Sequence, residues 1–162
     1  MQKYIIDGNN LIGKIRSLQK LQKNDKQAAR EKLVLLVERY FHKMKFRVSL
    51  HFDGYPNESL RISAGKIIYS QNKTADEKIK DEIASSGNPK NLIVVTSDNN
   101  LKEFARVCSC KIISSEEFSS ALYKQEEKDE EEEKIKLIND VEEFKRIFGE
   151  PMKGQSKKYR NP

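Results

Sequence analysis

Short apolar runs alternate with helical patterns along most of this chain, and the alternation limits the folds open to it. The runs that suit strands are Lys3–Ile6, Arg47–Phe52, Lys66–Ser70, Leu92–Thr96 and Lys111–Ile113. The fourth run opens with Leu92-Ile93-Val94-Val95, a continuous apolar stretch typical of a parallel strand that is covered on both faces. The alternation predicts a three-layer α/β/α domain with a mainly parallel central sheet.

Amphipathic helices are expected between these strands. The apolar residues of the first helix recur at helical spacing and are Leu33, Leu36, Val37, Tyr40, Phe41 and Met44. Thr74 and Glu77 predict a capping box at the start of a second helix. A third helix is expected after Asp98, and a fourth is expected to begin near Ser114 or Ser115.

The C-terminal part of the chain differs from the rest in composition. The α/β domain is expected over residues 1–124. An acidic linker is expected over 125–134, as solvated chain or as the start of an exposed helix. An amphipathic helix is expected over 135–149, with the apolar stripe Ile135, Ile138, Val141, Phe144 and Phe148. Residues 150–162 form a basic tail for which disorder is expected.

The charge of the chain is unevenly distributed. The segment Glu126–Glu133 holds seven acids and one lysine, so the total of +6 leaves +12 for the other residues. A domain this basic favours a polyanionic partner, although lysines also serve simply to keep a surface soluble. Lys14, Arg16 and Arg47 are candidate contacts to such a partner.

The remaining composition indicates a cytoplasmic protein. Cys108 and Cys110 are two positions apart, and we expect both to be reduced and structural. No signal peptide is expected, because Asp7 interrupts the N-terminus before an apolar region develops. No apolar run approaches the roughly 20 residues needed to span a bilayer, so no membrane association is expected.

Acidic residues follow three of the predicted strands. Asp7, Asp53 and Asp98 come directly after or close behind the first, second and fourth strand. Because parallel strands end at one edge of a sheet, these carboxylates are expected to converge there. Asp76 lies in the first turn of the helix that Thr74 caps, where an acid also has the ordinary role of stabilising the helix dipole.

Carboxylates gathered at one edge repel one another unless a cation binds between them. An all-oxygen set of ligands selects Mg²⁺ or Mn²⁺, and the candidate ligands are Asp7, Asp53, Asp76 and Asp98. A carboxylate-bound metal beside a basic surface favours phosphodiester chemistry. Asn10 is a candidate for binding a phosphate or a metal-bound water, and Thr96 and Ser97 are candidates for orienting the carboxylates.

The segments DGNNLIG, LHFDG, TADE and VVTSDNNL, in this order, resemble the YacP-like branch of the NYN domains, which are relatives of PIN-domain nucleases. The resemblance covers roughly residues 1–123. It implies a PIN-like α/β/α sandwich, Mg²⁺ or Mn²⁺ dependence and RNA cleavage, which in some members is linked to ribosomes. Asp7, Asn10, Asp76 and Asp98 match the family's site positions as catalytic residues. Asn9 stands where some relatives have an aromatic residue.

The expected function is therefore that of a metal-dependent endoribonuclease acting on mRNA, rRNA or tRNA. Tyr55 and Arg61, in the loop after the second strand, are further candidate RNA contacts, to a base and to a phosphate. The alternative is an RNA- or ribosome-binding module with a vestigial metal site. A phosphatase of the haloacid-dehalogenase type is disfavoured, because it needs a second aspartate two residues after Asp7, where this chain has Asn9.

Overall fold

A computed structural model of the chain describes residues 1–149. Five strands and their connecting helices form the first of two units into which the chain divides, Met1–Glu126 and Glu127–Pro162. The strands are β1 (Lys3–Asp7), β2 (Arg47–Phe52), β3 (Gly65–Tyr69), β4 (Leu92–Val95) and β5 (Lys111–Ile113). The helices are α1 (Gly8–Lys14), α2 (Arg16–Asn24), α3 (Lys26–Phe41), α4 (Ala75–Ala84), α5 (Asn99–Val107) and α6 (Ser115–Phe148), with a short 3₁₀ turn η1 (Pro89–Asn91).

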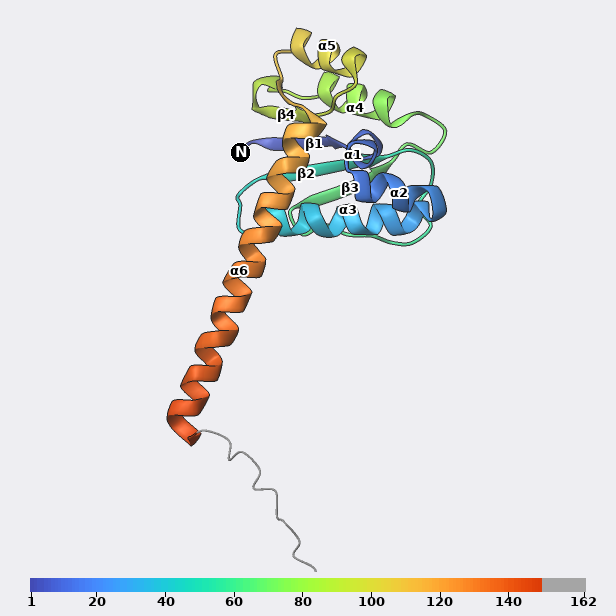
Figure 1. Cartoon of the computed structure of the whole chain (residues 1–162). Helices are drawn as coiled ribbons and strands as arrows, with labels where there is room; N and C mark the ends of the chain where they lie inside the picture. The colour runs from blue at the N-terminus through green and yellow to red at the C-terminus, as the bar shows by residue number, and fades with distance from the viewer. Residues whose placement is uncertain (150–162) are drawn as a thin grey trace, which may run out of the picture. The chain divides into compact units, whose positions relative to one another are not determined.

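The sheet is parallel throughout, with the strand order β3-β2-β1-β4-β5. β1 lies at the centre, paired with β2 from Lys3↔Arg47 to Asp7↔His51 and with β4 from Lys3↔Leu92 to Ile6↔Val95. In Figure 1, α4 and α5 cover one face of the sheet, and α1, α2 and α3 cover the other. This is the three-layer arrangement that the strand–helix alternation predicted.

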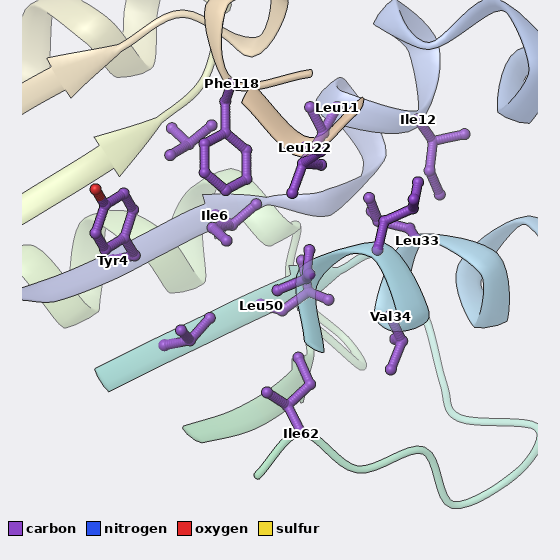
Figure 2. Close-up of a cluster of buried hydrophobic side chains, with 14 of the residues drawn as sticks. Tyr4, Ile6, Leu11, Ile12, Leu33, Val34, Leu50, Ile62, Phe118 and Leu122 are labelled. Carbon is purple, nitrogen blue, oxygen red and sulfur yellow. The ribbon is translucent and has the colours of Figure 1, made fainter. Parts of the chain in front are cut away.

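The larger part of the core lies between the sheet and α1, α2, α3 and the first turns of α6. Figure 2 shows it, with side chains from β1 and β2 facing Leu33 of α3 and Phe118 of α6. Tyr4 stacks edge-on against Phe41 and lies near Phe118, with ring centroids 4.8 and 6.0 Å apart respectively. A smaller apolar cluster on the other face joins β1 and β4 to α4 and α5. Burial from both sides explains why β4 is apolar at every position.

The structure differs from the expected elements between β1 and α3. No helix is expected from sequence directly after the first strand, but α1 begins there, and Asp7 is its N-cap. The Asp7 side chain accepts a hydrogen bond from the backbone N–H of Asn10, as N-cap aspartates do. Asp, Gly and Asn are common in turns and also at the N-termini of helices, so these residue types alone do not tell one from the other.

The acidic segment 125–134, for which solvated chain or an exposed helix start is expected, lies within a helix. α6 runs without a break from Ser115 to Phe148. Glu and Lys favour helices, and neither Gly nor Pro interrupts this stretch. The amphipathic helix expected over 135–149 is the end of α6, and its apolar side chains, such as Val141 (53 %) and Phe148 (72 %), are more than half exposed. The expected disorder of the basic tail concerns residues 150–162, which lie outside the described residues.

Across the part of the chain that the structure describes, no helix combines the length and the apolar character that crossing a membrane requires.

Candidate metal centre

The carboxyl edge of the sheet gathers the four aspartates that the sequence singled out. Asp7 ends β1, Asp53 follows β2, and Asp98 follows β4 as the N-cap of α5. Asp76 reaches the same edge from the first turn of α4. Together they line one open hollow, whose residues are Asp7, Asn9, Asn10, Asp53, Thr74, Ala75, Asp76, Asp98 and Asn100.

Asp7 is the most deeply buried of these acids, with 8 % of its surface exposed. Its Oδ1 accepts from the backbone N–H of Asn10 at 3.3 Å, and its Oδ2 accepts from the Thr96 hydroxyl at 3.1 Å. Burial raises the pKa of Asp7, and the nearby carboxylates of Asp53 and Asp76 raise it further, while the two hydrogen bonds lower it. The site therefore holds a carboxylate whose negative charge is poorly compensated by the protein.

Gly8 explains how β2 comes so close to Asp7. A Cβ atom at position 8 would lie 2.6 Å from Cε1 of Phe52 and 2.7 Å from the carbonyl oxygen of His51. These distances are shorter than any normal contact, so only glycine fits where α1 leaves the sheet. The glycine after Asp7 is thus required by packing at this point of the site.

Thr96 links two of the acids. Its hydroxyl donates to Asp7 and accepts from the backbone N–H of Asp98 at 3.1 Å. Asp98 in turn caps α5, because its Oδ1 accepts from the N–H of Leu101 at 2.8 Å. The hydroxyl of Thr96 therefore fixes Asp7 and Asp98 relative to each other, which is the orienting role expected for this residue.

Asn10 is held by the segment that follows β4 and by the start of α6. Its Oδ1 accepts from the N–H of Ser97 at 2.9 Å and from the hydroxyl of Ser115 at 2.7 Å. The Ser97 hydroxyl donates to the carboxylate of Glu116, which lies 3.4 Å from Nζ of Lys14. With its oxygen occupied, Asn10 presents its NH₂ group as the donor available to a ligand.

Asp76 has a positively charged neighbour on its own helix. Its Oδ2 lies 2.9 Å from Nζ of Lys80, one turn further along α4. The helix begins with the expected capping box, in which Thr74 and Glu77 bond to each other's backbone N–H groups. The cap fixes where α4 starts and therefore where Asp76 lies.

Asp53 makes a different set of contacts, all through N–H donors of the protein. Its Oδ1 accepts from the backbone N–H of Ala75 at 2.7 Å, and its Oδ2 accepts from Nδ2 of Asn9 at 3.0 Å. Its own backbone N–H donates to Oδ1 of Asn9 at 3.2 Å. The sequence analysis did not assign this role to Asn9, whose partner lies 44 residues away.

The donor chemistry of the hollow suits a hard divalent cation, since the acids offer only oxygen. Within the residues that the structure describes, however, no three acidic, histidine or cysteine side chains are placed closely enough to hold an ion together. Their oxygens serve as helix caps and ion-pair partners instead. The type of ligand fits a magnesium or manganese site, whereas their present rotamers do not converge on one point.

Four candidate RNA contacts lie near the carboxyl edge or in its connecting loops. Lys14 ends α1 and Arg16 begins α2, close to the end of β1. Tyr55 is 57 % exposed, and its hydroxyl donates to the side chain of Asn72. Arg61 lies in the same β2–β3 connection and is exposed. Their roles as RNA contacts stay predictions.

Arg47 lies at the other end of the sheet. It is the first residue of β2, whereas Asp53 follows the last. At roughly 3.3 Å per residue, a strand of this length separates the two by about 20 Å. Arg47 is therefore not part of the surface around the acids, because the direction of the strand carries it to the amino edge.

Arg30 is a residue of this region that the sequence analysis missed. It projects from α3 and donates from Nη2 to the carbonyl oxygen of Asp53 at 2.6 Å and from Nη1 to that of Tyr55 at 3.3 Å. Its guanidinium lies 5.4 Å from the ring centre of Phe52 and 5.5 Å from that of Tyr69. No local pattern predicts such a contact, because the partners are more than 20 residues apart.

His51 lies beneath the edge, as its place within the strand indicated. Its side chain is 1 % exposed, and Nε2 lies 2.6 Å from Oε2 of Glu82 in α4. The other oxygen of Glu82 accepts from the Ser49 hydroxyl at 2.8 Å and pairs with Lys3. Burial acts to raise the pKa of Glu82, but the bonds from His51, Lys3 and Ser49 outweigh it and lower the pKa to about 2.

Comparison with solved structures shows the same fold in a bacterial protein. The crystal structure of the W164L mutant of Rae1 (YacP) from Bacillus subtilis superposes with a TM-score of 0.68, at 26 % identity, over 81 % of this chain and 80 % of that chain. Another crystal structure of the same protein gives a TM-score of 0.73 at 23 % identity, over 91 % and 87 % of the two chains. No curated protein sequence matches.

The family model of the YacP-like NYN domain matches residues 4–160, which is nearly the whole chain. This match and the solved structures indicate a PIN-like protein of nuclease type with an RNA-related function. Nucleases of the NYN and PIN-like kind generally use divalent metals. The chain belongs to the YacP-like NYN domain family.

Proposed function

We propose that this protein is a metal-dependent endoribonuclease that hydrolyses RNA phosphodiester bonds at the carboxyl edge of its sheet. The observation that carries the proposal is the hollow that four aspartates line from four different parts of the fold. A protein gains nothing in stability from bringing acids together, since their repulsion opposes folding. Such an arrangement is explained if a cation and a phosphate bind there.

Asp7, Asp76 and Asp98 are the residues that we propose hold Mg²⁺ or Mn²⁺. Each rests on a rigid element, at the end of β1, in the first turn of α4 and at the cap of α5. The bound ion would supply a water of lowered pKa and positive charge beside the phosphate. The raised pKa of Asp7 fits this role, because a cation at Asp7 would offset the cost of its buried charge.

The remaining polar groups of the hollow would bind and orient the RNA. The NH₂ group of Asn10 is directed by the bonds that its oxygen accepts from Ser97 and Ser115, and it can donate to a phosphate oxygen. Lys14, Arg16 and Arg61 would add charge attraction to the backbone of a longer RNA. Tyr55 offers an exposed ring on which a base can stack.

One observation favours a second candidate, an RNA- or ribosome-binding module with a vestigial metal site. In the described part of the chain, no three potential ligands are close enough to hold an ion as they stand. Asp76 also has a cationic partner already, in Lys80. A module that only binds RNA would tolerate such an arrangement, whereas a nuclease must rearrange it on binding the metal.

The test is RNA cleavage by the purified protein, with single-stranded and structured RNAs, in the presence of Mn²⁺, Mg²⁺ or EDTA, and with and without ribosomes. We expect cleavage with Mn²⁺ or Mg²⁺ and none with EDTA. Asp7→Asn and Asp76→Asn should abolish cleavage, since they remove ligands, but leave RNA affinity unchanged or higher, since they remove negative charge.

Asp81→Asn is the matched control. Asp81 lies on α4 like Asp76, but it is exposed, and its Oδ2 lies 2.7 Å from Nζ of Lys73. This variant makes the same chemical change on the same helix outside the hollow, and it should cleave as the wild type does. A wild-type protein that shifts RNA in a gel but cuts no substrate with any metal, even with ribosomes, would establish the binding module instead.

A further inference from the structure

Asp53 differs from the other acids of the hollow in how its polar atoms are used. Both carboxylate oxygens accept from N–H groups of the protein, its backbone N–H donates to Asn9, and its carbonyl oxygen accepts from Arg30. Both carboxylate oxygens of Asp7 also accept hydrogen bonds, whereas the described contacts of the Asp98 carboxylate engage only Oδ1 and those of the Asp76 carboxylate only Oδ2. Asp53 is thus joined to three other elements, α4, α1 and α3.

The contact with Asn9 is reciprocal. The side-chain NH₂ of Asn9 donates to Asp53 Oδ2 at 3.0 Å, and its side-chain oxygen accepts from the Asp53 backbone N–H at 3.2 Å. An amide is required for this pairing, because a carboxylate at position 9 has no donor and a hydroxyl cannot span both atoms. The pairing ties the first turn of α1 to the residue that follows β2.

Arg30 holds the same segment from α3. Its two donors reach the carbonyl oxygens of Asp53 and Tyr55, and its guanidinium packs over Phe52 and Tyr69. A guanidinium stacked on aromatic rings is restricted in its movement, so it fixes the backbone it binds. The carboxylate of Asp53 is therefore presented from a fixed backbone.

The remaining oxygen of Asp53 holds the start of α4. Ala75 is the first residue of this helix, and its N–H donates to Asp53 Oδ1 at 2.7 Å. Such N-terminal N–H groups have no partner within the helix, and a carboxylate stabilises them through both the hydrogen bond and the helix dipole. The next residue is Asp76, so the bond fixes the turn that carries this acid.

We propose that Asp53 is a positioning residue, which together with Asn9 and Arg30 holds the first turn of α4 so that Asp76 faces the metal. The proposal rests on the proposed nuclease function where it concerns the metal and the RNA. The part that concerns how the first turn of α4 is held does not depend on that function. It differs from the sequence-based expectation, in which Asp53 is itself a ligand. The two roles make different demands at position 53. Positioning needs a hydrogen-bond acceptor there, whereas ligation needs the negative charge.

The test compares Asp53→Asn with Asp53→Ala. Asparagine keeps an oxygen that can accept from Ala75, and alanine does not. We expect exchange of the Ala75 amide hydrogen, followed by NMR, to stay within about threefold of wild type in Asp53→Asn and to rise at least about tenfold in Asp53→Ala, which loses one hydrogen bond. Asn9→Ala, which removes only the reciprocal pairing, should give an intermediate rate.

Calorimetric titration with Mn²⁺ and RNA kinetics supply the second readout. Mn²⁺ affinity should fall less than about fivefold in Asp53→Asn, which loses a nearby charge and the acceptor for the Asn9 side chain but no ligand. It should fall at least about thirtyfold in Asp76→Asn, which loses a ligand. In Asp53→Ala we expect kcat for RNA to fall at least about tenfold with KM within about twofold, because Asp76 is displaced while the RNA contacts remain.

Two outcomes would overturn the proposal. Loss of Mn²⁺ affinity in Asp53→Asn as large as in Asp76→Asn, with the Ala75 amide still protected, would make Asp53 a ligand. Unchanged Ala75 exchange in Asp53→Ala would show that the carboxylate does not hold α4. If the wild type neither binds Mn²⁺ nor cuts RNA, the nuclease proposal fails, and amide exchange still decides whether Asp53 fixes the helix.

Discussion

β1 and β2 present different side chains to the two faces of the sheet. Toward α1, α2 and α3 they place Tyr4, Ile6, Val48, Leu50 and Phe52, all in one apolar cluster. Toward α4 the intervening positions of β2 are Ser49 and His51, both bonded to Glu82, and Asp53 follows in the same alternation. One face of the two strands is therefore part of the main core. On the other face, β2 forms a row of polar groups that leads to the candidate metal centre, while β1 places Ile5 in the smaller apolar cluster.

The difference shows how a small domain carries a charged site without losing its stability. Side chains alternate along a strand, so every second position can bury apolar surface while the others face a separate environment. Asp7 of β1 lies opposite His51 of β2 in the pairing of the two strands. The row of polar side chains on β2 therefore extends to Asp7, the most buried acid of the site. We infer that the apolar face supplies most of the folding free energy, and four predictions test this.

The largest effect is expected on the apolar face. Leu50 is fully buried, and Leu50→Ala should lower the free energy of unfolding by about 3 kcal/mol, from lost burial and the cavity left behind. Leu35 of α3, which is 60 % exposed, is the matched control, and Leu35→Ala should cost less than about 0.5 kcal/mol. Urea unfolding followed by circular dichroism measures both, and equal losses would contradict the assignment of the core.

The polar face should make stability depend on pH through Glu82. Its pKa is lowered from 4.5 to about 2 in the folded protein, so its contribution is present above pH 4.5 and is lost as the pH falls toward 2. Because the Glu82 carboxylate is only partly buried, solvent screens its interactions. We therefore expect it to contribute about 2 kcal/mol to the free energy of unfolding near pH 6, less than its full pKa shift implies. Glu82→Gln should remove it.

The measurement for Glu82 is the difference in unfolding free energy between wild type and Glu82→Gln at several pH values. That difference should shrink steadily between pH 4.5 and pH 2, as the wild-type carboxylate becomes protonated. A difference that stayed constant over this range would mean that charge on Glu82 is not what holds Ser49 and His51.

The charge on Asp7 is expected to change stability in the direction opposite to that of Glu82. The pKa of Asp7 is raised in the folded protein, so the folded state favours the protonated carboxyl group. The free energy of unfolding therefore falls as the pH rises through this raised pKa. At pH 7 without metal, Asp7→Asn should therefore raise the free energy of unfolding by about 1 kcal/mol. Thermal melts with and without Mn²⁺ measure this. Added Mn²⁺ should stabilise the wild type and not the variant, and a destabilised variant would contradict the expectation.

The smallest effect is expected for Ser49. Ser49→Ala removes one hydroxyl that donates to Glu82 at 2.8 Å while His51 and Lys3 still bind that carboxylate. The cost should be about 0.5–1 kcal/mol, the usual net value of one hydrogen bond. The same urea titration checks it, and a loss as large as that of Leu50→Ala would remove the distinction between the two faces.

Much of the fold could be predicted because its strands are local apolar runs. The expected strands agree with those of the structure to within one residue at each end, and Thr74 caps its helix as its spacing with Glu77 indicated. α1 and α2 were missed, because Asp-Gly-Asn-Asn suits a turn as well as a helix start. The sequence left both solvated chain and helix open for the acidic segment, because a run of acids suits solvated chain and also propagates a helix.

The site could be predicted only where it follows from strand direction. The rule that parallel strands end at one edge correctly brought Asp7, Asp53 and Asp98 to the same hollow. The same rule places Arg47, at the start of β2, at the amino edge of the sheet, opposite to the acids. The contacts of Asn9 and Arg30 could not be predicted, because each joins side chains and backbone that are distant in the chain and are brought together only by tertiary packing.

The central position of β1 has a consequence for how the protein is made. β1 leaves the ribosome first, yet its neighbour β4 begins at Leu92 and the acid beyond it is Asp98. At roughly 5–20 residues per second, Asp98 is added about 5–20 s after Asp7. Pairings between such distant segments also form slowly. Unfinished chains thus lack the complete set of acids, so the candidate metal centre forms only after most of the sheet has been made.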